Sequence, residues 1–228
     1  MKLAIFDLDE TLVGGDTASL FCAYLVEQGL AGPELLVQEA ELMQAYARGT
    51  LDMAAYIRVM TAPVRHLSAE SLQQQVDDFV CNRVLPRHFP QARERLDAHR
   101  RSGDCCIIIS ATADFIVHRV AAALDVPHAL AIDLSRTPDG RLDGGILGTP
   151  SFREGKVQRL ENWLQGQPLA ISETLFYSDS RNDLPLLEHC DKPHVVNPDP
   201  ELSRLARTRG WPILHWMRGP HTPLQMTP

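Results

Sequence analysis

The first fifteen residues place the strongest constraint on the fold. Residues 3–6 are apolar, Asp7 follows them directly, and a second carboxylate, Asp9, comes two positions later. A short apolar run that ends at polar residues and a glycine pair predicts a buried strand. Ligands of open α/β sheets bind just beyond the carboxyl ends of the strands. Asp7 and Asp9 are therefore predicted to lie at a site.

The two acids also indicate what such a site binds. Carboxylates this close repel each other unless a cation or a shared proton relieves the repulsion. A hard cation with oxygen ligands does so, and Mg²⁺ is the ion we expect. The alternative is a strand end that carries two solvated acids. Taken alone, that alternative is the commoner case, so residues further along the chain have to decide.

Strand and helix signals alternate in the second part of the chain. Strand-like apolar runs lie at 105–109, 130–134, 145–148, 174–178 and 194–197. Helical periodicity of apolar residues is found at 86–101, 115–124, 155–164, 184–190 and 202–209. The turn-rich residues 137–140 predict a β-hairpin between the second and third runs. The alternation predicts an α/β fold with a doubly wound parallel sheet.

Three of the predicted strands end in polar residues. These residues are Asp7, Ser110 and Asp179. Neighbouring parallel strands end at the same edge of a sheet, so the three side chains are expected to share one pocket if their strands are adjacent.

Residues 16–83 show helical periodicity and no strand signal. The pattern predicts about four helices, which we interpret as a helical bundle inserted after the first strand. This segment, 16–83, is called the cap below, and residues 1–15 with 84–228 are the predicted core domain. The alternative is that residues 16–83 form an ordinary part of a single core.

Charge and cysteine content exclude some partners. The net charge is −7, which argues against binding of nucleic acid, and no apolar stretch is long enough to span a membrane. The five cysteines are odd in number and lack metal-type spacing, so free thiols in the reducing cytoplasm are expected. The proline-containing tail from Arg218 onward is expected to be poorly ordered. The sequence leaves the oligomeric state open.

Four motifs together resemble those of the haloacid dehalogenase superfamily, in the phosphoserine-phosphatase-like branch with a helical cap. They are Asp7-Leu8-Asp9-Glu10-Thr11, Ser110 after an apolar strand, Lys156 at a helix start, and Asp179-Ser180-Arg181-Asn182-Asp183. Each motif is weak alone, because Ser110 resembles a helix cap and Lys156 a surface lysine. The resemblance covers nearly the whole chain and implies a Rossmann-like core with an inserted helical cap.

The resemblance implies a role for each of the acidic groups. Asp7 is expected to attack phosphorus and form an aspartyl-phosphate, and Asp9 to act as general acid and then general base. Mg²⁺ is expected at Asp7, the Asp9 main-chain carbonyl and Asp179. Asp183 is expected to orient Lys156 or to act as a metal ligand, directly or through water.

The resemblance also implies how substrate is held. Ser110 and the backbone N–H of Ala111 are expected to bind phosphate oxygens, Lys156 to offset negative charge, and Asn182 to contact the substrate. Asp16 stands where phosphoserine phosphatases carry a Glu that binds the substrate's amino group. Arg58 stands where they carry an Arg that binds its carboxylate.

Motif two departs from the phosphoserine phosphatases. Those enzymes usually carry Ser-Gly-Gly, whereas this chain has Ser110-Ala111-Thr112. The expected substrate is thus a small phosphorylated metabolite such as histidinol phosphate, with phosphoserine or transfer of the phosphoryl group to an alcohol as alternatives.

Other classes of protein fit less well. A dehalogenase needs neither Asp9 nor a metal, and a phosphonate hydrolase of the superfamily needs a cap lysine, which residues 16–83 lack. A receiver-type signalling domain has no helical insertion. A phosphoryl-binding protein without activity is expected to have lost Asp7, Asp9 or Lys156, all of which are present.

Overall fold

The computed structural model of the chain describes residues 1–217. Six parallel strands form the main sheet, in the order β3-β2-β1-β6-β7-β8. They are β1 (Lys2–Phe6), β2 (Cys105–Ala113), β3 (His128–Ile132), β6 (Glu173–Ser178), β7 (Lys192–Val196) and β8 (Ile213–Leu214). The predicted α/β fold with a doubly wound parallel sheet is confirmed. The predicted tail from Arg218 lies outside the described residues.

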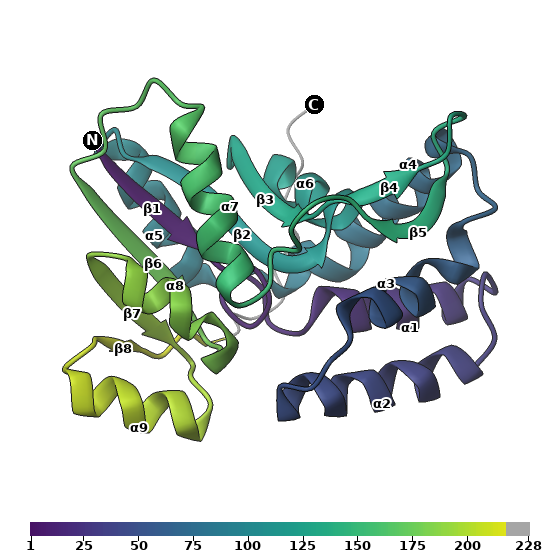
Figure 1. The fold of residues 1–228 in the computed structure, drawn as a ribbon, viewed down its shortest axis with the longest axis horizontal. Helices are drawn as coiled ribbons and strands as arrows, with labels where there is room; N and C mark the ends of the chain where they lie inside the picture. The colour runs from purple at the N-terminus through teal and green to yellow at the C-terminus, as the bar shows by residue number, and fades with distance from the viewer. Residues whose placement is uncertain (218–228) are drawn as a thin grey trace.

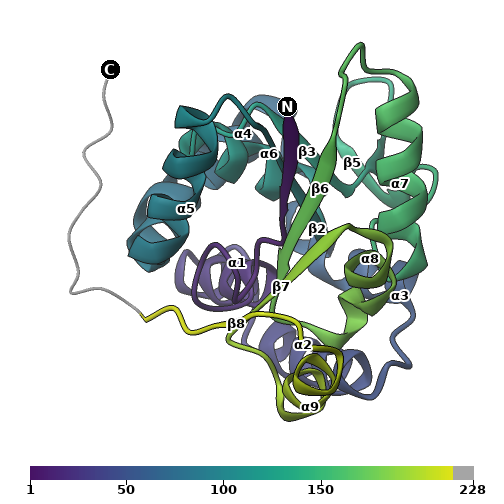
Figure 2. The same ribbon diagram turned by 90° about the vertical axis from the view of Figure 1, so that its left-hand side faces the viewer.

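Helices cover both faces of the sheet, as Figure 2 shows with α5 and α6 on one side and α7 and α8 on the other. The core helices are α5 (Pro90–Arg101), α6 (Asp114–Ala123), α7 (Glu154–Gln165), α8 (Leu184–His189) and α9 (Pro200–Arg209). In β1, Leu3 and Ile5 pack with the α7 and α8 side, whereas Ala4 and Phe6 pack with the α5 and α6 side. Burial of both faces explains why β1 is apolar at every position after Lys2.

The strand order reverses direction at β1. The chain reaches β2 and β3 on one side of β1, and β6 and β7 on the other. Phe6 is in register with Ile108 of β2 and with Tyr177 of β6, so these strands end close together. The expected adjacency of the strands that precede Asp7, Ser110 and Asp179 is therefore present, and it creates the crevice where ligands of doubly wound sheets bind.

Four helices lie between β1 and α5, beside the carboxyl edge of the sheet (Figure 1). They are α1 (Thr17–Glu27), α2 (Glu34–Arg48), α3 (Met53–Thr61) and α4 (Ala69–Phe79). Asp16, Asp52 and Ser68 begin α1, α3 and α4, and each side chain accepts a backbone N–H of the first turn. Side chains from these helices and from the core share one apolar cluster, so the division into the cap (16–83) and a core stays a prediction.

The hairpin differs from the prediction. Residues 128–132 belong to the main sheet as β3, and the hairpin is formed by β4 (Leu134–Arg136) and β5 (Leu142–Ile146). A single residue, Asp133, separates β3 from β4, so the two strands read as one apolar run. The hairpin extends to the cap (Figure 1), where Arg65 donates a hydrogen bond to the Asp143 carbonyl at 3.4 Å.

Within residues 1–217, the structure contains no helix of the length and apolar character needed to cross a membrane. All five cysteines are free, as expected, and three of them, Cys22, Cys106 and Cys190, are buried.

Candidate active site

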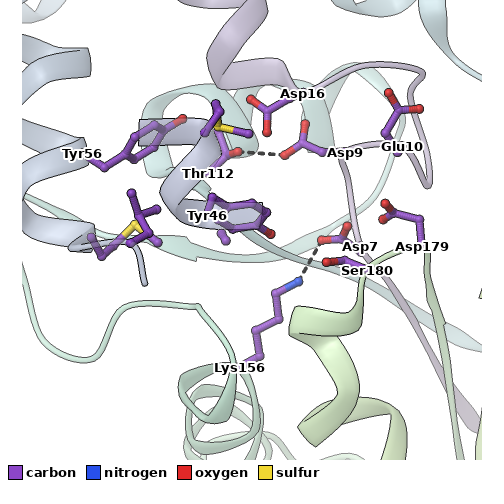
Figure 3. A pocket seen from close by; sticks show the side chains of 14 residues that line it. Asp7, Asp9, Glu10, Asp16, Tyr46, Tyr56, Thr112, Lys156, Asp179 and Ser180 are labelled. Atoms are coloured by element: carbon purple, nitrogen blue, oxygen red, sulfur yellow. Dashed lines mark hydrogen bonds and ion pairs between the residues drawn. The ribbon is translucent and has the colours of Figure 1, made fainter. Parts of the chain in front are cut away.

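The predicted catalytic residues gather at the carboxyl edge of the sheet. Asp7 and Asp9 follow β1, Asp179 follows β6, and Lys156 projects from the first turn of α7. All four line one cavity, together with Ala111 at the end of β2 (Figure 3). The structure thus brings together residues that are up to 172 positions apart in the chain.

Lys156 lies between two carboxylates. Its Nζ atom donates to Oδ1 of Asp7 at 2.8 Å and lies 2.6 Å from Oδ1 and 2.8 Å from Oδ2 of Asp183. The Ser178 hydroxyl also donates to Oδ2 of Asp183 at 2.7 Å. All four residues are buried. Both carboxylate oxygens of Asp183 therefore contact protein donors, and the contact with Lys156 holds its Nζ atom beside Asp7.

The Asp9 carboxylate is held at both oxygens. Oδ1 accepts the backbone N–H of Thr17 at 2.7 Å, and Oδ2 accepts the hydroxyl of Thr112 at 2.9 Å (Figure 3). The backbone of the next residue, Glu10, has φ of 51°. This left-handed conformation lets the chain turn back, so that the N–H groups of residues 12 and 13 donate to the Leu8 carbonyl.

Asp179 is held by the last polar residue of motif one. The Thr11 hydroxyl donates to Oδ1 of Asp179 at 3.2 Å, and the backbone N–H of Asp179 donates to the same hydroxyl oxygen at 3.1 Å. Thr11 is fully buried. The second carboxylate oxygen of Asp179 has no protein hydrogen bond among the described residues and lines the cavity with Asp7.

The electrostatics of the site are dominated by burial of negative charge. Burial raises the pKa of Asp7 to about 6, although the Lys156 ammonium opposes the shift. Burial and the nearby charges of Asp16 and Asp7 raise the pKa of Asp9 to about 8. Burial and the charge of Asp7 also hold the pKa of Asp179 well above its usual range. Burial alone would lower the pKa of Lys156, but Asp183 and Asp7 hold it above its usual value.

These groups fit a divalent cation with oxygen ligands. Asp7 and Asp179 offer carboxylate oxygens to the same cavity, and a single lysine is shared by two of the acids. Burial raises the pKa values of these acids, and the positive charge of a metal ion would oppose that effect. Among the described residues, no cluster of three or more His, Cys, Asp or Glu side chains has the arrangement of a complete metal site. The main-chain carbonyl of Asp9 stays the predicted third ligand beside Asp7 and Asp179.

The cap supplies the other wall of the cavity. Its lining side chains are mostly apolar or aromatic: Met43, Tyr46, Leu51, Met53 and Tyr56. Asp16 adds a carboxylate on the same side (Figure 3). Among the described residues that line the cavity, Lys156 is the one cation. The volume of about 200 Å³ suits a small molecule rather than a polymer.

Three predicted substrate-binding residues lie away from the cavity lining. Arg58 is exposed and lines a different hollow between α3 and the start of α2, with Leu35 and Val59. Ser110 is fully buried, and its hydroxyl oxygen accepts the Thr112 N–H at 3.1 Å. Asn182 lies beyond the cavity, where its Oδ1 accepts from Arg153 at 3.3 Å. Arg58 is therefore not among the residues that line the cavity with Asp7, and its contact with substrate stays a prediction.

The sequence pattern of the haloacid dehalogenase-like hydrolases matches residues 4–188, which include every residue of this site. The chain belongs to this family. A histidinol-phosphatase of Neisseria meningitidis serogroup C (strain 8013) is 37% identical over 219 residues, which cover 94% of this chain and 99% of that protein. The family and this relative confirm the predicted enzyme class, a phosphatase.

Solved structures of the haloacid dehalogenase-like fold agree with this assignment. A protein with unknown function from Bordetella pertussis Tohama I has 38% sequence identity and a TM-score of 0.87, over 93% of this chain and 97% of that chain. A substrate-bound phosphoserine phosphatase has 18% identity and a TM-score of 0.68, over 93% of this chain and 92% of that chain. The second likeness confirms the fold alone.

Sequence reasoning missed several residues of this hydrolase site. Thr11 and Thr112 were recognised as parts of motifs, but their contacts with Asp179 and Asp9 were not predicted. Tyr46 and Tyr56 were not predicted to line the site. Phosphoserine phosphatases usually have Gly where this chain has Thr112. This difference was the one sequence signal that could have indicated a contact there.

Proposed function

We propose that this hydrolase removes phosphate from a small phosphate monoester through an aspartyl-phosphate on Asp7. The observation that carries the proposal is the buried pair of Asp7 and Lys156, 2.8 Å apart, at the floor of a cavity that also contains Asp9 and Asp179. Lys156 holds the Asp7 carboxylate and offsets the charge of an incoming phosphate. This arrangement suits nucleophilic attack by a carboxylate.

The reaction proceeds in two displacements. A carboxylate oxygen of Asp7 attacks phosphorus, the bond to the ester oxygen breaks, and Asp9 donates its proton to the departing alkoxide. Asp9, now ionised, removes a proton from water, which attacks the phosphorus of the acyl phosphate. Inorganic phosphate leaves, and the Asp7 carboxylate is restored. General acid–base assistance of this kind contributes on the order of 10²–10⁴-fold.

Mg²⁺ is the proposed cofactor. Asp7, Asp179 and the main-chain carbonyl of Asp9 would hold it. When bound, the ion neutralises charge on the phosphoryl oxygens as the group is transferred. Asp183 is proposed to position Lys156 rather than to bind the metal directly, because its oxygens already accept from Lys156 and Ser178.

Phosphate oxygens are proposed to lie against the turn after β2 and against Lys156. Ala111 lines the cavity, so its backbone N–H is the candidate donor beside it. The hydroxyl of Ser110 already accepts from the Thr112 N–H, which leaves its own proton available to a phosphate oxygen. Asn182 is proposed to act indirectly, since it is not among the cavity-lining residues and its Oδ1 accepts from Arg153.

Histidinol phosphate is the proposed substrate. The relative from Neisseria meningitidis carries that name, and the cavity walls suit a leaving group that has an amine and a flat ring. The Asp16 carboxylate faces the cavity for the amine, and the rings of Tyr46 and Tyr56 flank the remaining space. Phosphoserine carries a carboxylate in addition, and it would meet Asp16 without a cation from Arg58 to balance it.

The free cysteines indicate the cellular compartment that we propose. Five free thiols suit a reducing environment, so the cytoplasm is the proposed location.

A panel of phosphate monoesters tests the proposal. With Mg²⁺, histidinol phosphate is expected to be hydrolysed with a higher kcat/KM than phosphoserine or sugar phosphates, and Asp7→Asn is expected to abolish turnover while the circular dichroism spectrum is unchanged. Preference for phosphoserine would reject the substrate assignment. Substantial turnover by Asp7→Asn would reject the aspartyl-phosphate mechanism.

A further inference from the structure

The last residue of motif two faces the proposed acid. Thr112 lies near the end of β2, is 3% exposed, and lines the cavity. Figure 3 shows its side chain directed at Asp9, with the hydrogen bond between them drawn. Its hydroxyl donates to Oδ2 of Asp9 at 2.9 Å. A glycine at this position, as in the motif of the phosphoserine phosphatases, has no group that makes this contact.

The two hydrogen bonds on Asp9 make its oxygens inequivalent. Oδ1 accepts from the backbone N–H of Thr17, a group that can only donate, so this contact favours the ionised form of that oxygen. Oδ2 is paired with a hydroxyl, which can rotate to donate or to accept. Each carboxylate oxygen has two lone-pair sites, so Oδ2 keeps one for the proton that moves to the leaving group.

We propose that Thr112 is a positioning residue that holds the Asp9 carboxyl group with Oδ2 toward the reacting atoms. The inference rests on the proposed acid–base role of Asp9. The hydroxyl contact restricts rotation of the carboxyl group and adjusts to both of its protonation states during the two displacements. Proton transfer depends steeply on this geometry, since a displacement of about 1 Å can cost about 10²-fold in rate.

The hydroxyl of Thr112 is itself oriented from the cap. The Thr17 hydroxyl, in the first turn of α1, lies 3.5 Å from that of Thr112 and donates to it. Donation from Thr17 leaves the proton of Thr112 directed at Asp9. Contacts therefore run from Thr17 of α1 through Thr112 of β2 to Asp9. The alignment of the acid depends on this position of α1 relative to the sheet.

Leaving-group dependence tests the inference. The value of kcat/KM reports the steps up to departure of the alcohol. An alkyl phosphate such as histidinol phosphate needs a proton from Asp9 in those steps, whereas p-nitrophenyl phosphate, with its stable leaving group, does not. Thr112→Val removes the hydroxyl at nearly constant shape. We expect kcat/KM to fall about 10- to 100-fold for the alkyl phosphate and less than about threefold for p-nitrophenyl phosphate.

The ratio of the two substrates is measured in one preparation, so any loss of folded enzyme cancels. Thr112→Ser keeps a hydroxyl and should restore the wild-type ratio, and Thr112→Ala replaces Thr112→Val if the valine variant does not fold. Thr61→Val is the matched control, because Thr61 is a buried threonine whose hydroxyl donates to the Ile57 carbonyl at 2.7 Å, away from the site. It should leave the ratio unchanged.

The outcomes separate the inference from the proposed function. Equal losses on both substrates in Thr112→Val, or no loss on either, would overturn the role of Thr112. Wild-type activity of Asp9→Asn on the alkyl phosphate would instead overturn the acid role of Asp9. A changed ratio in Thr112→Val, its restoration in Thr112→Ser, and a larger change of the same sign in Asp9→Asn would support both.

Discussion

Lys156 and Asp7 are joined by a buried ion pair of 2.8 Å across 149 positions of the sequence. The side chains are 3% and 9% exposed, so water screens the pair little. The same ammonium group contacts Asp183. One cation therefore connects the end of β1, the start of α7 and the turn after β6, and its loss should affect both the chemistry and the fold.

Replacement of Lys156 by Met should abolish turnover and lower the free energy of unfolding. Asp7 and Asp183 would remain buried without their cation, and breaking a buried ion pair on one side costs about 3–5 kcal/mol. Urea unfolding followed by circular dichroism measures the loss. Lys192→Met is the control, because Lys192 is exposed and lies 4.0 Å from Glu173. Equal, small losses in both variants would contradict a structural contribution of the Lys156 pair.

Asp9→Asn should separate the two displacements. The Asn side chain keeps the size of Asp9 but cannot remove a proton from water. With p-nitrophenyl phosphate, which needs no proton for its leaving group, we expect a burst of p-nitrophenolate followed by turnover slower by about 10²-fold or more. Rapid-mixing absorbance at the p-nitrophenolate band measures the burst. Normal steady-state turnover without a burst would show that Asp9 does not activate water.

Removal of metal should stop hydrolysis, and its return should stabilise the protein. EDTA is expected to abolish activity, and Mg²⁺ at about 100 times its Kd should add about 2.7 kcal/mol of stability. Thermal unfolding with and without Mg²⁺ measures the rise in Tm. Asp179→Asn should reduce that rise, whereas Asp139→Asn, at an exposed hairpin turn, should not. A rise of the same size in Asp179→Asn would remove Asp179 from the ligand set.

Asp16 and Arg58 should differ in their effect on substrate binding. Asp16→Asn removes the charge that faces the cavity. It keeps the side-chain hydrogen bond at the N-terminus of α1, because Asn and Asp stabilise the first turn of a helix equally well. We expect KM for an amine-bearing substrate to rise about tenfold. Arg58→Ala should leave kcat/KM within about twofold, since Arg58 faces a different hollow. A large loss in Arg58→Ala would show that the cap rotates this side chain to the substrate.

His88 should weaken the fold as the pH falls. Burial, with a smaller effect of the Arg93 charge, lowers the pKa of His88 to about 4. The unfolded chain takes up a proton at this histidine below about pH 6.5, whereas the folded chain does so only near pH 4. The free energy of unfolding should therefore decrease as pH falls from about 6.5 to 4, by at most about 3 kcal/mol.

His88→Gln should flatten that dependence. Stability of wild type and variant is compared by urea unfolding at several pH values, and the difference between the two curves isolates His88 from the buried acids. His118→Gln, at an exposed position of α6, controls for loss of a histidine. Parallel curves for wild type and His88→Gln would show that the histidine is solvated in the folded state.

Much of the fold could be predicted because its signals are local. The apolar residues before Asp7 read as a strand, since both faces of β1 are buried. The hairpin was misplaced because one residue, Asp133, separates β3 from β4, and strand β8 was missed because it has two residues. Which apolar run joins the main sheet depends on pairing with β2, and pairing is a long-range property.

Some residues of the site were also predictable from local sequence, whereas others depended on tertiary packing. Asp7, Asp9, Lys156 and Asp179 were identified from motifs, because the chemistry of phosphoryl transfer needs those side-chain types in those segments. The hollow that Arg58 lines could not be predicted, because helical periodicity describes a face of α3 only relative to its own axis. The packing of α3 against the core turns that face to another hollow.

The sequence by itself determined the class of fold and the family, and it identified the acids and the lysine that line the cavity. Tertiary structure alone decided which protein groups donate hydrogen bonds to Asp9 and Asp179. Thr112 and Asp9 are 103 positions apart, and Thr11 and Asp179 are 168 apart. Contacts of about 3 Å between such residues depend on strand order and on the seating of the cap, because no local pattern specifies which side chains meet across a sheet.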